Sequence, residues 1–181
     1  MSGSQRLADF DNSWYNTGAG FFKKTAWYFI NAIFINSFFP FNGIKILLLK
    51  LFGANIGKGV IVKPFVSIKY PWKLTVGNHV WIGEKVWIDN LDTVIIENNV
   101  CISQGAMLLC GNHNYKNSTF DLMIGKIVLK EGSWIGAKSI VTGNVTVSEN
   151  AILQVGSVAS QNLEKDCLYR GNPAIKIKNR F

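Results

Sequence analysis

The sequence predicts a mainly β fold, a parallel β-helix, and three observations predict it. Aliphatic or small residues recur at every sixth position from Leu129 to Ala159. The fourth position after each of them is small or slim, as at Ser133 and Ser139. A period of six matches neither a helix nor a hairpin meander, but it fits one short strand plus one corner of a β-helix. Upstream, the period breaks after every third repeat, which indicates three strands in each triangular coil.

The N-terminal segment, residues 1–55, precedes the repeats. Met1–Gln5 has neither the basic start nor the apolar core of a signal peptide. Phe21–Phe52 is rich in aromatic and aliphatic residues, but asparagines, glycines and a proline interrupt it, so no clean apolar run of about twenty residues exists. We expect one or two helices packed on the first coil. The alternative is an interfacial anchor whose basic residues face anionic lipid, namely Lys23, Lys24, Lys45 and Lys50.

The repeats occupy residues 56–163. Their aliphatic positions should point inward and fill the core, with successive coils stacked about 4.8 Å apart. The residue five places after each aliphatic position should point outward, as His113 and Trp87 do in this register. Trp81, Cys101 and Trp134 should then form one external column. Such an apolar column predicts contact with a neighbouring subunit, or alternatively a platform that binds a ligand.

One interruption is much longer than the others and predicts a loop that leaves the β-helix at residues 112–127. Long loops in compact, periodic folds are usually functional. His113 stands at the root of this loop, where a neutral imidazole is suited to act as a general base near pH 7; the alternative is a structural loop histidine. His79 lies within a regular repeat and is expected to be a solvated turn residue. A nucleophilic pair of Cys110 with His113 is a weaker alternative, since no third orienting group is nearby.

These features resemble a known family. The repeats, the histidine loop, Trp134–Ala137 and the closing Gly171–Ala174 are similar to the hexapeptide-repeat acyltransferases. The closer resemblance is to the colanic acid biosynthesis acetyltransferase branch, which adds Asn12–Tyr15 and the two tryptophan segments Trp81–Gly83 and Trp87–Asn90. The resemblance covers nearly the whole chain. It implies a left-handed β-helix, a homotrimer with clefts between subunits, acetyl-CoA as acetyl donor, and a sugar hydroxyl acceptor in surface polysaccharide biosynthesis.

The resemblance also assigns roles around the acceptor. It implies direct transfer, with His113 as the general base and no covalent enzyme intermediate. Asn90 is the first acceptor-binding candidate, because an amide both donates to and accepts from hydroxyls; otherwise it only turns its corner. Asp89, Asp11 and Tyr115 are further candidates. Asn114 follows the histidine where relatives often carry aspartate, so any orienting contact from this position would lack charge.

For the donor, the resemblance points to the stretch around Trp134 and to the basic C-terminus. The residues expected to bind CoA are Trp134, Gly136, Ala137, Val155, Gln161, Lys176, Lys178 and Arg180. Many relatives have a lysine where this chain has Gln161. The basic tail, residues 164–181, would have to supply the missing charge to the CoA phosphates, unless it is simply a solvated tail.

Composition bounds the remaining choices. The chain has 181 residues, 48% of them hydrophobic, and a net charge of +8, which together indicate one globular domain with an anionic or membrane partner. Its scattered cysteines and absent ligand motifs predict a cytoplasmic protein without bound metal, and no nucleic-acid-binding motif is present. Peripheral contact at the inner face of the membrane, and a free or lipid-linked acceptor, remain open. The alternative functions are an amino-sugar N-acetyltransferase and a non-catalytic trimeric scaffold.

Overall fold

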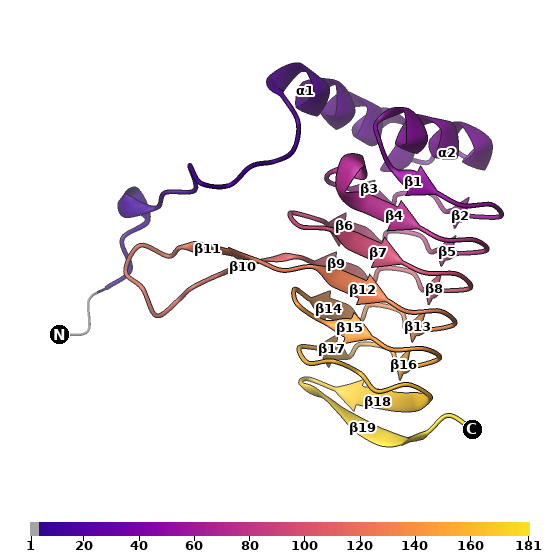
Figure 1. Cartoon of the computed structure of the whole chain (residues 1–181). Helices are drawn as coiled ribbons and strands as arrows, with labels where there is room; N and C mark the ends of the chain where they lie inside the picture. Colours follow the sequence, from indigo (N-terminus) through magenta and orange to yellow (C-terminus); the bar gives the residue numbers. More distant parts are fainter. Residues whose placement is uncertain (1–3) are drawn as a thin grey trace.

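The computed structural model describes residues 4–181. Its body is a parallel β-solenoid of five complete three-stranded coils and a partial sixth, with helices at one end and a projecting hairpin partway along (Figure 1). This confirms the predicted fold class of a β-helix with an N-terminal helical segment and a protruding loop. Strand pairing between successive coils is parallel throughout the body, and the register joins residues that share one place in the repeat.

Three sheets form the three faces of the solenoid. The first sheet contains β1 (Asn55–Ile56), β4 (Leu74–Val76), β7 (Val94–Ile96), β12 (Ile127–Leu129) and β15 (Thr146–Val147). The second contains β2 (Ile61–Val62), β5 (Trp81–Ile82), β8 (Cys101–Ile102), β13 (Trp134–Ile135), β16 (Ile152–Leu153), β18 (Cys167–Gly171) and β19 (Ala174–Asn179). The third contains β3 (Ser67–Ile68), β6 (Trp87–Asp89), β9 (Met107–Leu109), β14 (Ile140–Thr142) and β17 (Val158–Ala159).

Side chains of the repeat explain why the chain coils this way. The aliphatic positions, such as Ile82 and Ile135, are fully buried along the axis. The small positions lie at corners, where Ser139 is buried and its hydroxyl donates to the Gln154 carbonyl at 2.6 Å. At Gly83 an added Cβ would stand 2.7 Å from a backbone nitrogen of the next coil. The aliphatic positions of the repeat therefore fill the core, and its small and glycine positions allow successive coils to pack closely.

The N-terminal helices cover the open edge of the first coil. Trp27 Nε1 donates to the Ile68 carbonyl at 2.8 Å, and the Asn42 amide bonds to the backbone of β2 and its preceding residue. Lys45 is fully buried and its Nζ donates to the Lys63 carbonyl at 3.1 Å. Lys45 thus faces the solenoid, which corrects its expected place among lipid-facing lysines. The helices are η1 (Leu7–Asp9), α1 (Phe21–Ile30), the π-helix η2 (Asn31–Ile35), α2 (Asn42–Leu51) and η3 (Pro71–Lys73).

Within residues 4–181, no helix combines the length and the apolar character needed to cross a bilayer. The long loop contains an antiparallel hairpin, β10 (Gly111–His113) and β11 (Leu122–Ile124), which stands out from the body (Figure 1). The N-terminal arm reaches it, and the Arg6 amide donates to the Ser118 carbonyl at 2.8 Å. Residues 164–181 are largely strand, because β18 extends the second sheet and β19 folds back on it.

Candidate active site

His113 is held in one orientation at the root of the hairpin. Its ring stacks on Phe120 with centroids 4.1 Å apart and planes 1° from parallel, and Phe10 lies on another side at 5.6 Å. Nδ1 lies 2.8 Å from the Phe120 carbonyl oxygen. A carbonyl only accepts hydrogen bonds, so Nδ1 carries the proton and Nε2 of the neutral ring keeps its lone pair. The geometry therefore presents Nε2 as a proton acceptor.

The hairpin around His113 is braced by its own polar groups. His113 pairs with Leu122 across the strands, and the Asn114 amide donates to the Asp121 carbonyl at 2.9 Å. Hydrogen bonds from the side chains of Thr119 and then Asn117 lower the pKa of Asp121. The Asn114 side chain accepts from the Lys116 amide at 3.1 Å. Its contact is therefore with the turn, while a backbone carbonyl orients the imidazole.

An N-terminal arm fastens the base of this region, a contact that the aromatic residues of Asn12–Tyr15 did not by themselves predict. The Tyr15 hydroxyl donates to the Leu91 carbonyl at 2.6 Å, and Lys73 Nζ donates to the same oxygen at 2.6 Å. Burial raises the pKa of Tyr15 and lowers that of Lys73. The Lys73 ammonium also lies 4.7 Å from the Tyr15 ring centroid. Phe10, farther along this arm, is thereby brought against His113.

Cys110 lies below the hairpin and is 1% exposed. Burial raises the pKa of its thiol to about 12. A thiol of this kind stays protonated near neutral pH, and only the thiolate is an effective nucleophile. These observations weigh against the alternative in which Cys110 and His113 form a nucleophilic pair. His79 is exposed in a turn with φ of 56°, as expected for a solvated turn residue.

The four acceptor-binding candidates lie in different surroundings. Asn90 is fully buried, and its amide accepts from the Tyr70 N–H at 2.9 Å and donates to the Tyr70 carbonyl at 2.6 Å. Its polar atoms therefore serve the corner, the alternative considered from the sequence. Asp89 Oδ1 lies 2.9 Å from Lys69 Nζ, so the two side chains form an ion pair, but the geometry is not that of a hydrogen bond. Asp11 is exposed beside Phe10, and Tyr115 is 79% exposed on the hairpin.

A groove of about 600 Å³ lies on the outer surface of the second sheet. It gathers four of the predicted donor-binding residues, Trp134, Gly136, Ala137 and Val155. Trp134 Nε1 donates to the Ser103 hydroxyl at 2.8 Å, and Trp134 is stacked in register on Cys101 and Trp81, which confirms the predicted external column. The remaining lining residues are Ser103, Gln104, Ile152, Leu153, Gln154, Leu168 and Arg170.

The other predicted donor residues do not line this groove. Gln161 and Lys178 are exposed elsewhere, and Lys176 pairs with Glu164 at 2.7 Å. Arg180 donates to the carbonyls of Gly132 and Asn150, so its guanidinium bridges the corners of two successive coils. The cation in the groove is Arg170, which belongs to the basic C-terminal segment but was not among the individual residues expected to bind CoA. The alternation of buried Cys167 and Tyr169 with outward residues in β18 is the signal that could have placed it there.

A single chain keeps the histidine and the groove apart. The hairpin leaves the solenoid after β9 of the third sheet, whereas the groove lies on β13, β16 and β18 of the second. In Figure 1 the hairpin projects from one side and β13 and β16 lie toward the other. Among the described residues 4–181, no group of three or more histidine, cysteine, aspartate or glutamate side chains is placed to hold a metal ion.

Comparison with known proteins gives acetyltransferases as relatives. No protein-family model matches the chain. The protein named as the colanic acid biosynthesis acetyltransferase WcaF of Escherichia coli (strain K12) is 35% identical over 136 residues, 75% of each chain. Galactoside O-acetyltransferase of the same strain is 24% identical over 139 residues, covering 72% of this chain and 66% of that one.

Solved structures show the same fold at lower sequence identity. A hexapeptide-repeat-containing acetyltransferase from Vibrio cholerae superposes with a TM-score of 0.80 at 17% identity, over 88% of this chain and 91% of that one. The same Vibrio cholerae protein complexed with acetyl coenzyme A gives 0.79 at 16% identity, over 88% and 87%. A galactoside acetyltransferase in complex with coenzyme A also gives 0.79, at 20% identity over 88% and 81%.

Proposed function

Because the chain belongs to the hexapeptide-repeat acetyltransferases, the family of the colanic acid biosynthesis acetyltransferase WcaF, we propose that it acetylates a sugar hydroxyl during assembly of a surface polysaccharide. It is an acetyltransferase and its donor is acetyl-CoA. The observation that carries the finer proposal is the 2.8 Å contact between His113 Nδ1 and the Phe120 carbonyl oxygen. The Nδ1 proton is engaged by this carbonyl, which leaves Nε2 free to accept a proton.

In the proposed reaction, His113 Nε2 takes the proton of the acceptor hydroxyl as its oxygen attacks the acetyl carbonyl carbon. The new C–O bond gives a tetrahedral intermediate, the C–S bond then breaks, and the proton passes from His113 to the departing sulfur. The Phe120 carbonyl stabilises the imidazolium formed in between, since its oxygen faces Nδ1–H. No side chain is acylated, in keeping with the buried, protonated Cys110.

The groove on the second sheet supports binding of the donor. Trp134, Ala137 and Val155 offer apolar surface to a pantetheine arm, and Gly136 lets the next coil pack closely, with Val155 N 2.6 Å from where a Cβ would stand. Arg170 supplies the cation that phosphates require. The tail residues Lys176, Lys178 and Arg180 and the turn residue Gln161 receive no support from the groove, and we assign the phosphate contact to Arg170 instead.

We infer a homotrimer in which each active site is shared between subunits. The support is that one chain carries its base and its groove on different sides of the solenoid, so a second copy has to bring a histidine to a groove. The external column of Trp81 and Trp134, exposed by 58% and 45%, gives a surface for such a neighbour. Closed cyclic symmetry would repeat this contact three times.

For the acceptor, we propose that the sugar lies between His113 and the N-terminal arm. Asp11, whose carboxylate accepts from the Ser13 amide at 2.8 Å, and Tyr115 remain the candidates with exposed polar atoms. Asp89 lies beside Gly111, where the hairpin begins, with its Oδ2 3.9 Å from where a Cβ of Gly111 would stand. The three free cysteines and the use of acetyl-CoA support a cytoplasmic location. The acceptor is a sugar or glycan, either free or linked to a lipid.

The test is acetyl-CoA turnover on a panel of sugars, amino sugars and nucleotide sugars, with the parent chain and with His113→Ala. Acetyl ester formation that requires His113 is the expected result. Amide formation on amino sugars would replace the proposal by N-acetylation. Absence of turnover with every acceptor, in a protein that still binds acetyl-CoA, would favour a non-catalytic trimer.

A further inference from the structure

The net positive charge of this protein is confined to one end of the solenoid. Residues 12–83 contain eight lysines and neither aspartate nor glutamate. The rest of the chain contains eleven basic and eleven acidic residues, so it is neutral overall. Residues 12–83 build the arm, both helices and the first coil, together with most of the second. The whole net charge of +8 therefore lies at the helical end.

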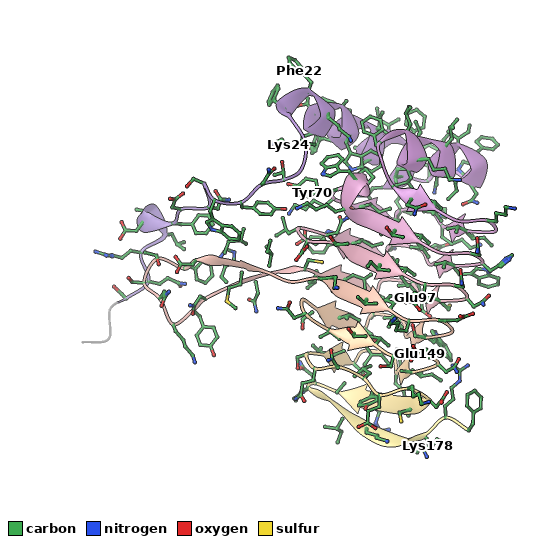
Figure 2. The ribbon with its side chains drawn as sticks, viewed as in Figure 1. Phe22, Lys24, Tyr70, Glu97, Glu149 and Lys178 are labelled. Carbon is green, nitrogen blue, oxygen red and sulfur yellow. The ribbon has the colours of Figure 1, made fainter. Side chains whose placement is uncertain are left out.

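The same end carries a large exposed apolar surface. Its members lie on α1, η2, α2 and the connection between the helices, and Phe22 is 86% exposed. Figure 2 shows Phe22 on the side of α1 that points away from the solenoid, with Lys24 on the side toward it. The exposed large apolar residues of this end are Phe21, Phe22, Tyr28, Phe29, Ile33, Phe38, Phe41, Ile44, Leu47 and Leu51. Many exposed apolar side chains gathered on neighbouring elements indicate an interaction surface.

The two faces of these helices have separate tasks. Asn31, Asn42 and Lys45 point inward and bond to the backbone of the first coil. These three polar residues of the apolar sequence therefore make their hydrogen bonds on the inner face. On α2, Ile44, Leu47 and Leu51 follow a helical spacing and remain 43%, 64% and 74% exposed. The outer face of α2 is consequently apolar, while Asn36 in the connection between the helices stays exposed.

The basic residues lie where they can flank that outer face. Lys23 Nζ stands 4.9 Å over the Trp72 ring, and Lys24 is half-buried on the solenoid side of α1. Lys50 and Lys58 are exposed. An amphipathic helix with apolar residues on one face and lysines on its flanks lies in the plane of a lipid surface. Its lysines then meet anionic head groups while its aromatic and aliphatic residues enter the acyl boundary.

We propose that the helical end of this solenoid, residues 21–52 with the lysines around it, docks on an anionic lipid bilayer. A second copy is a poorer occupant, because two such ends would bring like charges together without any acidic residue to pair them. The hairpin leaves the third coil. At about 4.8 Å per coil and about 10 Å for a helix, His113 would stand roughly 20 Å from the docked face. The site would therefore meet a glycan carried on a lipid.

The first test is co-sedimentation of the full chain with phosphatidylcholine vesicles, with and without phosphatidylglycerol. We expect binding that requires phosphatidylglycerol and weakens as salt is raised, because head-group attraction is screened. No sedimentation with anionic vesicles at low salt would overturn the proposal. Equal binding to neutral and anionic vesicles would also overturn it, since the lysines would then contribute nothing.

Matched variants locate the contact. Phe22→Ser with Leu47→Ser should weaken partitioning by about tenfold or more, whereas Ile175→Ser with Phe181→Ser removes comparably exposed side chains at the opposite end and should leave it unchanged. Lys50→Glu should weaken binding by about tenfold, and Lys126→Glu, which changes another exposed lysine, should weaken it far less. Equal losses in the test and control variants would contradict docking by the helical end.

Two further measurements distinguish membrane docking from a subunit contact at the same face and from the proposed acetyl transfer. Light scattering of Phe22→Ser with Leu47→Ser should show the same assembly as the parent chain, and dissociation would mean that another subunit covers the face. The inference rests on charge and exposure and stands apart from acetyl transfer. Activity on a water-soluble acceptor should therefore be equal in parent and variant, so a failure of either proposal is visible without the other.

Discussion

At the scale of single residues, the orientation of His113 depends on the backbone. The Phe120 carbonyl fixes the Nδ1 proton at 2.8 Å, and Phe120 itself has a φ of 52°, in the left-handed region that few non-glycine residues occupy. Strained backbone of this kind persists where the surroundings enforce it, as the hairpin ladder and the stacked ring do here. The imidazole is thereby oriented without a carboxylate partner.

The first prediction concerns His113. His113→Ala should reduce kcat by about 10²–10⁴-fold, the usual loss when a general base is removed. The KM for acetyl-CoA should change little, because the groove lies on another sheet. Steady-state kinetics with a saturating acceptor measures both values. A kcat within a few-fold of the parent would remove His113 from the mechanism.

The second prediction concerns Cys110. Burial raises its pKa to about 12, so the folded protein should keep this thiol protonated and unreactive at pH 8, while the unfolded chain reacts. Because folding opposes ionisation, the contribution of Cys110 to stability is present at neutral pH and falls as pH rises above the ordinary thiol pKa. Iodoacetamide labelling mapped by mass spectrometry, with and without denaturant, measures this difference.

Cys110→Ala provides the functional control for the same residue. The variant should keep activity within a few-fold of the parent, since direct transfer uses no thiol. A loss as large as that of His113→Ala, in a protein with unchanged thermal stability, would revive a nucleophilic role for Cys110.

At the scale of elements, the corners of the coils limit what the sequence can tolerate. An added Cβ at Gly83 would stand 2.7 Å from Gln104 N of the next coil, whereas at Gly43 in α2 nothing lies within 4 Å. Gly83→Ala should destabilise the protein by about 1–3 kcal/mol through overpacking. Gly43→Ala should stabilise it by up to about 1 kcal/mol, because alanine favours helix. Urea denaturation of both variants gives the comparison, and equal stability would contradict the assigned packing.

The sequence predicted the coils well because the residue types within each six-residue repeat determine the local geometry of that repeat. The aliphatic, small and glycine positions mark the core, the corner and the close contact, and each recurs in register. Elements at the ends could be predicted less well. The sequence predicts Lys45 to be a surface lysine, because the carbonyl of the first coil to which it donates is distant in the sequence. Residues 164–181 read as a basic tail because the partner of β19 is another strand rather than a repeat.

For the site, too, residues with a local sequence signal could be predicted, and residues placed by distant contacts could not. His113 and the residues around Trp134 follow from motif and register. The two bonds of Asn90 to Tyr70 are invisible in the sequence, which therefore left both an acceptor role and a corner role open. The contact of Phe10 with His113 joins positions far apart in the chain and has no local signature. Long-range contacts of this kind become apparent only once the arm is folded along the hairpin.

At the scale of the whole molecule, the separation of histidine and groove leads to an assembly prediction. Light scattering should give about three times 20.2 kDa at micromolar concentration. An active monomer would exclude a shared site. Analytical ultracentrifugation across a dilution series would show whether activity and the trimer disappear together.

Complementation tests the sharing directly. His113→Ala and Arg170→Ala, each impaired alone, should regain activity when they are unfolded and refolded together, because some sites then combine an intact histidine with an intact groove. Random mixing in equal amounts should restore about a quarter of the parent activity if each site joins two subunits of a cyclic trimer. A mixture no more active than its separate components would place the whole site within one chain.

The segments that cover the two ends of the solenoid also determine whether copies of the protein can associate end to end. A stack of parallel coils exposes unpaired N–H and C=O groups at each end, and either end could template the next molecule into an open-ended fibre. Here Trp27, Asn42 and Lys45 occupy such groups of the first coil, and the antiparallel β19 turns back along β18 at the other end. Truncation of the chain before β1 should therefore convert a discrete particle into one that elongates, which electron microscopy would show as filaments.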